Sequence, residues 1–207
     1  MQVLKPTEKN IQLAANMIKR GGLVVYPTDT VYGLGCNPLD EKALEKAFKA
    51  KQRRDKPFPI LAYSITDAQK IAHLTKEAKK LAKKYWPGPL TMVLLKKEIL
   101  PNLATCNQKT VGVRIPNHEI ALKLIHLSNG LLVGTSANKT GEPPPRNVQE
   151  AINQLGEKID VYLDAGPVKH GIPSTVIDLT AQPPRLLRKG PISLEEILKT
   201  LENSGSE

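Results

Sequence analysis

The stretch GGLVVYPTDTVYGLG, residues 21–35, combines a short apolar run with a polar loop that follows it directly. Leu23–Tyr26 has the length and composition of a buried strand, which Pro27 ends because proline cannot donate to a sheet. The loop carries hydroxyl groups, the carboxylate of Asp29, and glycines that let a ligand approach the backbone. Loops at strand ends are where open α/β sheets bind ligands. The loop is therefore a candidate binding segment, although Thr and Asp in turns also satisfy their own backbone.

Helical and strand patterns alternate along the rest of the chain. The residues that we expect to cap helices are Thr7, Asp40, Thr66, Thr75, Asn147 with Glu150, and Ser193 with Glu196. Strands are expected at 59–63, 90–95, 111–115, 131–135, 161–164, 175–179 and 185–188, with a further helix at 120–127. Alternation of this kind predicts a layered α/β domain.

The chain has 207 residues, of which 40% are hydrophobic and 24% charged. This composition is typical of a soluble globular protein, and we expect one domain over residues 1–207 with a frayed end at 203–207. The apolar runs are far shorter than the ~20 residues of a membrane helix, and the first residues lack the apolar core of a signal peptide. Cys36 and Cys106 cannot build a disulfide framework. We therefore expect a cytoplasmic protein with reduced cysteines and no membrane association.

The formal net charge of +10 arises in the first half of the sequence. Residues 1–103 hold 19 Lys and Arg against 9 Asp and Glu, whereas residues 104–207 hold 11 of each. Two stretches, 42–56 and 70–84, have a surplus of five positive charges each and together equal the excess. Such a surplus indicates an anionic partner, a nucleotide, tRNA or both. The alternative is a solvated lysine-rich helix face, which we favour for 70–84 but not for 42–56.

Lys51 and Arg53 stand at the end of the helical pattern that follows Asp40. Arginine offers a planar fork of donors and lysine a compact charge, so the pair suits a triphosphate. Cations at a helix C-terminus also complement the helix dipole, and this alternative stays open.

Two further loops and two arginines complete the candidates. Gly134–Asn138 follows a strand pattern and Gly171–Thr175 precedes one, and both are rich in small and polar residues. Arg114 and Arg188 each lie within an otherwise apolar strand run, where burying a charge is costly without an anion. The anion is an internal carboxylate such as Asp164, or the carboxylate or phosphate of a ligand.

Recognised nucleotide and hydrolase motifs are absent from the sequence. There is no Walker P-loop, no G-x-G-x-x-G and no H-E-x-x-H, and the four histidines do not have metal-ligand spacing. No Ser/His/Asp set or cysteine–histidine pair can be assigned. Composition and spacing thus lead to an α/β domain with a basic, anion-binding cleft and give no indication of a covalent mechanism.

Seven strings, taken in order, carry a resemblance to a known family. They are GGLVVYPTDTVYGLGC at 21–36, KQR at 51–53, YWPGPLTMVL at 85–94, KTVGVRIPNHEIALKLI at 109–125, GTSANKTGEPPP at 134–145, DAGPVKHGIPSTVIDLT at 164–180 and PRLLRKGPIS at 184–193. Over residues from about 10 to 200 the chain resembles the YrdC/TsaC family of threonylcarbamoyl-AMP synthases. The K-x-R…S-x-N motif of that family falls on Lys51, Arg53, Ser136 and Asn138.

The resemblance implies a nucleotidyltransferase that makes threonylcarbamoyl-AMP and pyrophosphate from L-threonine, bicarbonate or CO2, and ATP with Mg²⁺. Neither a protein nucleophile nor a tightly bound organic cofactor is implied. The product feeds the threonylcarbamoyladenosine modification of tRNA, so the implied downstream partner is tRNA or the threonylcarbamoyl-transferase machinery. The implied fold is a twisted, largely parallel α/β sheet flanked by helices, with a concave basic face.

Residue roles follow from the resemblance by motif position. Threonine would bind Thr30, Arg114 and Ser174, with Arg114 facing its carboxylate. The residues implied on the ATP side are Lys51, Arg53, Lys56, Thr110, Gly134, Ser136, Asn138 and Arg188. Lys51 and Arg53 would stabilise the charge of the reacting phosphates, and Mg²⁺ would arrive with ATP.

The chain departs from the family pattern in three places. Arg54 stands where many members have proline, and the loop that follows is about one residue short, which makes Lys56 a weaker candidate. Residues 60–63 lack the histidine that longer relatives place near threonine. The sequence ends one helix after Arg188, so it resembles the short, single-domain type rather than the two-domain members.

Two alternatives remain open from the sequence. The first is a non-enzymatic module that binds tRNA or another structured RNA on the same basic face, for which the charge surplus argues. The second is an inactive paralogue of the same fold, a branch that tends to lose the S-x-N residues and the serine before the late strand. The presence of Ser136, Asn138 and Ser174 favours the synthase.

Overall fold

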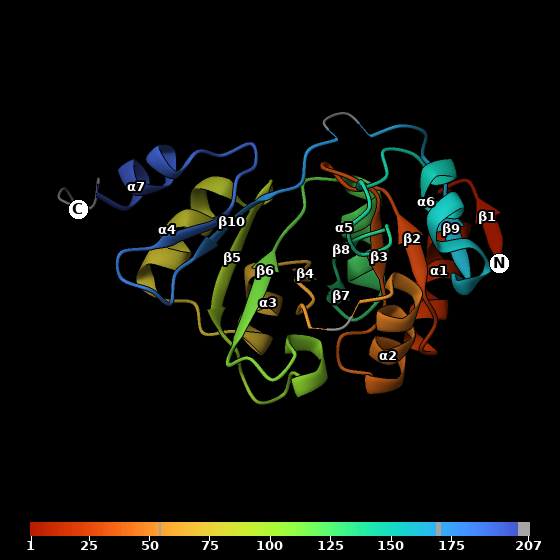
Figure 1. The fold of residues 1–207 in the computed structure, drawn as a ribbon, viewed down its shortest axis with the longest axis horizontal. Coiled ribbons are helices and arrows are strands. Elements are labelled where there is room, and N and C mark those ends of the chain that lie inside the picture. The colour runs from red at the N-terminus through yellow and green to blue at the C-terminus, as the bar shows by residue number, and fades with distance from the viewer. Residues whose placement is uncertain (54, 169–170, 203–207) are drawn as a thin grey trace.

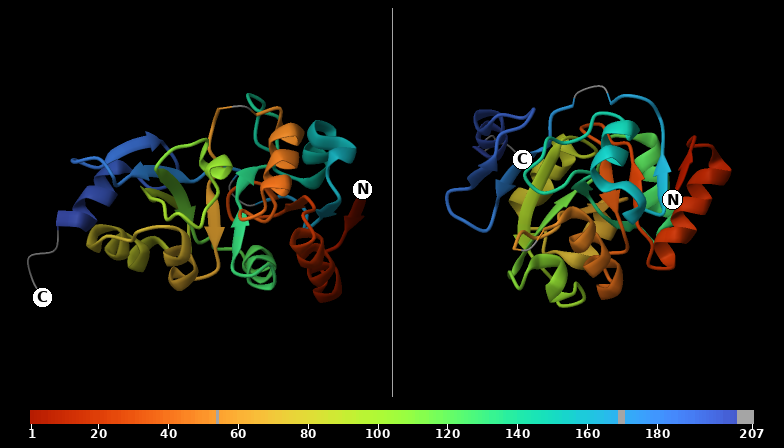
Figure 2. Two further views of the ribbon diagram at one scale, coloured as in Figure 1. Left: turned by 90° about the horizontal axis from the view of Figure 1, so that it is seen from below. Right: turned by 45° about the vertical axis from the view of Figure 1, so that its right-hand side comes forward.

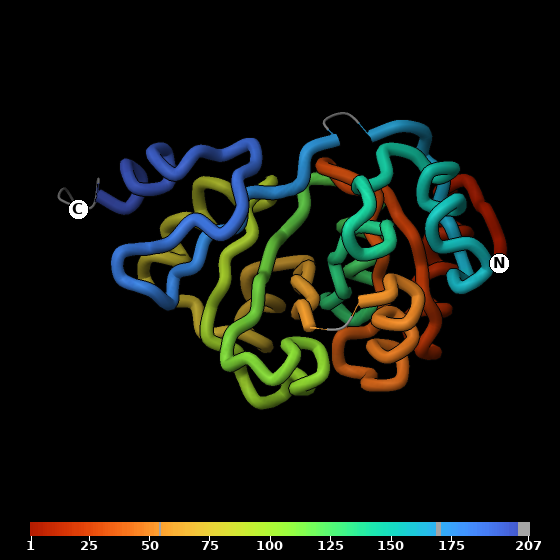
Figure 3. The backbone as a smooth tube through the Cα atoms, viewed as in Figure 1, coloured from red at the N-terminus to blue at the C-terminus, as the bar shows by residue number. Residues whose placement is uncertain are grey.

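The computed structural model describes residues 1–53, 55–168 and 171–202. Arg54 and the expected frayed end at 203–207 lie outside the described residues. The described chain forms two sheets that lie side by side along the long axis, with helices around them (Figure 1). The first strand and the last helix lie at opposite ends of this axis (Figure 3).

The helices and strands have the following bounds. The helices are α1 (Glu8–Lys19), α2 (Glu41–Lys51), α3 (Ile65–Ile71), α4 (Lys76–Tyr85), η1 (Asn102–Thr105), α5 (Glu119–Leu127), α6 (Val148–Leu155), η2 (Gly156–Lys158) and α7 (Leu194–Glu202). The strands are β1 (Gln2–Leu4), β2 (Val24–Tyr26), β3 (Gly33–Gly35), β4 (Ile60–Ala62), β5 (Leu90–Leu95), β6 (Thr110–Arg114), β7 (Leu131–Val133), β8 (Thr135–Ser136), β9 (Val161–Leu163), β10 (Thr175–Asp178) and β11 (Arg185–Arg188).

The five-stranded sheet has the order β1–β9–β2–β3–β8 and is covered on both faces. Strand side chains alternate between faces, so Val24 and Tyr26 of β2 pack with apolar residues of α1 and α5. Val25 points the other way, into the core that includes residues of α2 and α6. In the left view of Figure 2, α1 and α5 lie along one side of the molecule and α2 and α6 along the other.

The six-stranded sheet has the order β11–β10–β5–β6–β4–β7, and its two faces differ. Leu90, Met92 and Leu94 of β5 point into the core that includes the apolar residues of α3 and α4. The alternate residues Thr91 and Val93 point to the opposite face, where they line a cavity. Because strand side chains alternate, one face of this sheet is buried in the core and the other face lies against the cavity.

The expected α/β class is confirmed, and the arrangement within it is more mixed than the largely parallel sheet that we expected. Of the nine pairings between described strands, four are parallel and five antiparallel. The expected strand at 131–135 is two strands in different sheets, β7 and β8, because the chain leaves β7 at Gly134.

Helix capping follows the sequence with one exception. Thr7, Asp40, Thr75 and Asn147 accept hydrogen bonds from backbone N–H groups at the starts of α1, α2, α4 and α6, as predicted. The prediction that Thr66 caps a helix is wrong, because α3 begins earlier and Ser64 accepts from the backbone N–H of Asp67. In the part of the chain that the structure describes, no helix is long and apolar enough to cross a membrane.

Candidate functional site

A cavity of about 720 Å³ lies over the open face of the six-stranded sheet. Its floor is made by alternate residues of neighbouring strands. These are Thr91 and Val93 of β5, Thr110, Gly112 and Arg114 of β6, Ser174 directly before β10, and Val176 and Asp178 of β10. Segments 134–136 and 56–59, together with Arg53, contribute other lining residues. This volume lies in the range of small-molecule and cofactor sites.

The described lining of the cavity is strongly basic. Its cations are Arg53, Lys56, Arg114, Arg185 and Arg188, whereas Asp178 is its one carboxylate. Asp178 is already engaged, because its side chain accepts from the backbone N–H and the hydroxyl of Thr180 at 2.9 and 2.6 Å. The cavity is therefore suited to a ligand with several negative charges.

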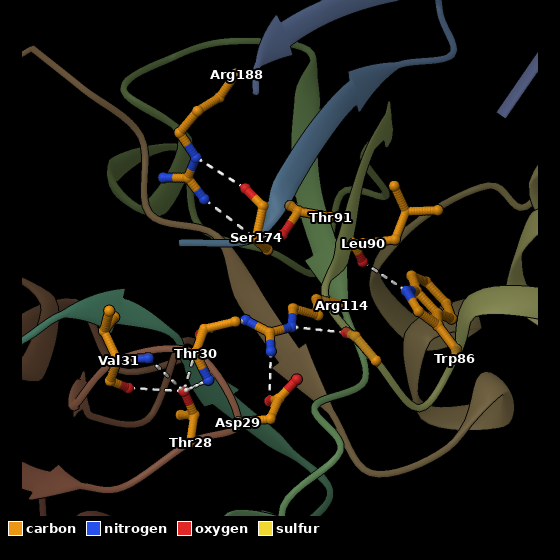
Figure 4. A network of polar contacts seen from close by, with 11 residues as sticks. Thr28, Asp29, Thr30, Val31, Trp86, Leu90, Thr91, Arg114, Ser174 and Arg188 are labelled. Atoms are coloured by element: carbon orange, nitrogen blue, oxygen red, sulfur yellow. Dashed lines mark hydrogen bonds and ion pairs between the residues drawn. The ribbon is translucent and has the colours of Figure 1, made fainter. Parts of the chain in front are cut away.

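Arg114 lies buried at one end of the floor, at the end of β6 (Figure 4). Its Nε donates to the backbone oxygen of Gly88 at 2.9 Å, and one terminal nitrogen donates to the hydroxyl of Thr30 at 3.1 Å. The other terminal nitrogen forms an ion pair with Asp29. Burial lowers the pKa of Arg114, and the charge of Asp29 opposes this shift. An internal carboxylate is therefore present, as one of the two expected alternatives, but it is Asp29 and not Asp164, which pairs with Lys5 at 2.7 Å.

Arg188 and Ser174 form a second polar group beside Arg114 (Figure 4). Arg188 donates to both the backbone oxygen and the hydroxyl of Ser174, at 3.0 Å each. The hydroxyl of Ser174 also lies 2.7 Å from that of Thr91 on the adjacent strand. Burial, and then the positive charge of Arg114, lower the pKa of Arg188. Both guanidinium groups line the cavity, and an anion bound there would offset their mutual repulsion.

Arg53 forms the cavity wall beyond the C-terminus of α2. Gln52 adopts a left-handed conformation, with φ of 51°, that ends the helix and turns the chain toward the cavity. Arg53 donates to the backbone oxygens of Lys56 and Pro57 at 2.6 and 2.7 Å, and its guanidinium lies 5.3 Å from the ring centre of Phe58. Burial lowers the pKa of Arg53. Arg53 is therefore a cation held in place on the cavity wall.

Lys51 has a different position from the one that we expected. It is 1% exposed and is not among the residues that line the cavity. Its ammonium donates to the backbone oxygens of Ser136 and Asn138, the latter at 2.7 Å. Its own backbone oxygen accepts from the N–H of Thr140 at 2.9 Å. Lys51 thus joins the end of α2 to the loop that forms the opposite wall, and does not reach the cavity.

Asn138, the last member of the K-x-R…S-x-N motif, is also not among the residues that line the cavity. Its amide donates to the backbone oxygens of Lys139 and Glu142 at 2.9 and 2.7 Å. Its side-chain oxygen is buried and has no hydrogen-bond partner among the described residues. The motif therefore divides in two: Arg53 and Ser136 line the cavity, while Lys51 and Asn138 hold the backbone behind it.

The structure brings nine of the eleven predicted residues to one cavity. They are Thr30, Arg53, Lys56, Thr110, Arg114, Gly134, Ser136, Ser174 and Arg188. Sequence reasoning missed Thr91, Gln108 and Asp178, which also line it. Two of these could have been found from strand alternation, because Thr91 is a polar residue within an apolar strand and Asp178 lies four residues after Ser174, on the same face.

Among the described residues there is no group of three or more His, Cys, Asp or Glu that could hold a metal ion. The cavity therefore offers basic and hydroxyl groups, with backbone exposed at Gly112 and Gly134. These are groups that bind phosphates and carboxylates.

Fold and cavity together define an α/β protein with a basic cavity over one face of its six-stranded sheet. A model of the family Sua5/YciO/YrdC, described as telomere recombination, matches residues 16–190. The chain belongs to this family.

Comparisons with individual proteins agree with this assignment. The chain is 46% identical over 196 residues to the threonylcarbamoyl-AMP synthase of Pyrococcus abyssi, covering 94% of this chain and 58% of that protein. A crystal structure of P. abyssi Sua5 complexed with L-threonine matches with a TM-score of 0.94 and 44% identity, over 98% of this chain and 61% of the other. The crystal structure of Escherichia coli YciO matches with a TM-score of 0.86 and 27% identity, and the match covers 95% of this chain and 98% of YciO. The chain thus spans about three fifths of the P. abyssi protein.

Proposed function

We propose that this protein is an L-threonylcarbamoyladenylate synthase. It would convert L-threonine, bicarbonate or CO2, and ATP into threonylcarbamoyl-AMP and pyrophosphate. The observation that carries the proposal is the single cavity that Arg114, Arg188 and Arg53 line together. Such a cavity suits one carboxylate and a polyphosphate together. The similarity to P. abyssi relatives named as the synthase and complexed with L-threonine supports the same proposal.

Threonine would bind at the Arg114 end of the cavity. Its carboxylate would accept from the guanidinium of Arg114, since a buried arginine gives a directed and permanently charged donor. Thr30 and Ser174 offer hydroxyl groups on either side, and both are buried and fixed by hydrogen bonds. These groups would hold the substrate amine and hydroxyl in one orientation.

The nucleotide would occupy the rest of the cavity. Arg188 and Arg53 are placed to neutralise phosphate charge, with Lys56 as a weaker candidate at the exposed edge. Thr110 on the floor and Ser136 on the wall offer hydroxyl groups, and Gly134 brings backbone close to the ligand. Lys51 and Asn138 would act on the nucleotide only through the loop that they hold.

The reaction needs no nucleophile from the protein. The neutral amine of threonine bonds to the carbon of CO2 and releases a proton, which gives a carbamate. A carbamate oxygen then attacks the α-phosphorus of ATP, the bond from this phosphorus to the bridging oxygen breaks, and pyrophosphate leaves with the electron pair. The protein would contribute alignment of two substrates and stabilisation of the negative charge on the phosphates. This chemistry makes the protein an adenylyl (nucleotidyl) transferase.

Magnesium would enter as the complex with ATP and is part of the substrate in this proposal. The phosphates supply the oxygen ligands that Mg²⁺ prefers. The product would pass to the threonylcarbamoyl-transferase machinery that modifies tRNA, and we place the reaction in the cytoplasm. The basic surplus of the sequence leaves direct tRNA binding as the second candidate function.

Pyrophosphate release tests the proposal. The purified protein with ATP, Mg²⁺ and bicarbonate should release pyrophosphate only when L-threonine is present. Arg53→Ala should lower this rate at least ~10²-fold, the scale seen when one preorganised donor is lost. Arg20→Ala, which removes an exposed arginine at the end of α1, is the matched control and should leave the rate unchanged. A folded protein with no threonine dependence but salt-sensitive tRNA binding would favour the RNA-binding function instead.

A further inference from the structure

We infer that Asp29 is a positioning residue that orients Arg114 to receive the carboxylate of the amino-acid substrate. The inference rests on the proposed function. Asp29 pairs with Arg114 but does not itself line the cavity, whereas its neighbours Thr30 and Val31 do. Its carboxylate therefore acts on the ligand through the guanidinium rather than by contact.

Asp29 is held in place by the turn in which it lies. The hydroxyl of Thr28 accepts from the backbone N–H groups of Thr30 and Val31 at 3.1 and 3.2 Å, and donates to the backbone oxygen of Val31 at 2.7 Å. Figure 4 shows these bonds around Thr28, with Asp29 directed at Arg114. The Thr28 hydroxyl thus holds the backbone of the turn that carries Asp29, and the ion pair with Arg114 holds the Asp29 side chain.

Three groups from two segments of the chain hold the guanidinium of Arg114. The Gly88 backbone oxygen holds Nε, the Thr30 hydroxyl holds one terminal nitrogen, and Asp29 holds the other. A guanidinium has five N–H groups, and these bonds use one on each nitrogen. Within the described chain, one N–H on each terminal nitrogen is left for a ligand. Arg114 lines the cavity, so these N–H groups can donate to a carboxylate that is bound there.

The charge of Asp29 matters as much as its direction. The Arg114 side chain is 7% exposed and lies near a second guanidinium, that of Arg188. An unpaired cation in this position would be costly, and the side chain would turn toward water or toward the phosphates of the nucleotide. Pairing with Asp29 keeps Arg114 at the threonine end and leaves Arg188 to the nucleotide. Asp29 thus separates the carboxylate-binding arginine from the phosphate-binding arginine.

Steady-state kinetics on Asp29→Asn and Asp29→Glu test this inference. The amide of Asp29→Asn keeps a hydrogen-bond acceptor but removes the charge, so the KM for threonine should rise at least ~10-fold, equivalent to ~1.4 kcal/mol, while the KM for ATP changes less than ~2-fold. Asp29→Glu restores the charge and should recover part of the threonine affinity. Asp40→Asn is the matched control, since Asp40 caps α2 and should affect neither KM.

Each outcome decides between positioning and plain stabilisation. A normal threonine KM in Asp29→Asn, or an equal rise in both KM values, would overturn the inference. If Asp29→Asn fails to fold, Asp29→Glu decides: calorimetric binding of L-threonine weakened by several fold supports positioning, and unchanged binding contradicts it. A wild-type protein without threonine-dependent pyrophosphate release would instead refute the proposed function itself.

Discussion

Substitution of Lys51 by methionine tests whether the lysine of the K-x-R motif stabilises the loop backbone, while the arginine of the motif acts in the cavity. Methionine has a similar length but no donor, so the backbone oxygens of Ser136 and Asn138 lose the ammonium that they now share. Each buried acceptor left without a partner costs about 1–3 kcal/mol, and relief from burying a charge offsets part of this. We expect a net loss of roughly 2–4 kcal/mol in the free energy of unfolding near pH 10, where burial leaves Lys51 as a neutral amine that still donates to both oxygens. For a domain of this length that is a decrease of roughly 4–16 °C in Tm.

The pH dependence of stability gives a second signature of Lys51. Burial, and then the charge of Arg53, lower its pKa from 10.5 to about 7. Between these two values the unfolded chain binds the proton and the folded chain does not, so the stability of the wild type rises as the pH rises through this window. Lys51→Met removes the group, and the rise should be smaller in the variant. Denaturant unfolding from neutral pH to about pH 10 measures the difference.

Arg53→Met is the variant with which the stability and the turnover of Lys51→Met are compared. Arg53 lies on the cavity wall and donates to a partly exposed loop, so its loss should change stability by less than ~1 kcal/mol. Its loss should instead lower turnover by ~10²-fold. Circular dichroism melts and pyrophosphate release on both variants check this. A Lys51→Met variant with wild-type Tm and a ~10²-fold slower reaction would refute the reasoning and assign Lys51 a direct contact with the nucleotide.

Three further predictions concern the cap of α7, the packing at Gly134 and the ion pair between Lys5 and Asp164. Ser193→Ala should lower the free energy of unfolding by about 1 kcal/mol in a denaturant titration, because it removes the side chain that caps α7. Gly134→Ala should destabilise by about 1–3 kcal/mol and weaken nucleotide binding in calorimetry, since the added Cβ would lie 2.3 Å from Cγ of Leu61. Lys5 lowers the pKa of the Asp164 carboxyl, so their pairing stabilises the fold above the ordinary pKa of an aspartate and is lost as the pH falls through the lowered value. Lys5→Met should remove less than ~1 kcal/mol of this acid-dependent stability, measured as urea midpoints at neutral and acidic pH.

The starts of most helices could be predicted from the sequence, because helix capping depends on residues within one turn. Thr7 and Asp40 cap helices where the sequence places them, since a capping side chain acts within its own turn. Ser64 precedes Thr66 as the cap of α3, because the carboxylate of Asp67 accepts from its hydroxyl at 2.6 Å and reinforces the earlier start. Both residue types are good caps, and this additional bond favours Ser64.

The internal partners of the site residues could not be predicted, because they depend on contacts between distant segments. Arg114 pairs with Asp29, which lies 85 residues away in the sequence. Asp164 was an equally valid partner until the fold placed it beside Lys5. Strand β3 was missed for a different reason: it holds two glycines, which rarely form strands, and it pairs with β2 across the loop that we expected to be irregular.

The direction of each motif side chain was also beyond the sequence. Lys51 and Arg53 are two residues apart, but α2 ends between them at the left-handed Gln52. The two cations therefore diverge, one into the protein and one toward the cavity. The sequence motif predicts which residues belong to the site, but the backbone conformation at Gln52 determines which of them lines the cavity.

The central claim is that this cavity joins a carbamate made on threonine to the α-phosphate of ATP. The most direct test is a mass spectrum of the product formed with isotopically labelled bicarbonate, L-threonine and ATP. The account predicts an adenylate with the mass of threonylcarbamoyl-AMP that carries the label in its carbamoyl carbon. An unlabelled threonyl-adenylate, or no threonine-containing adenylate from a folded protein, would contradict it.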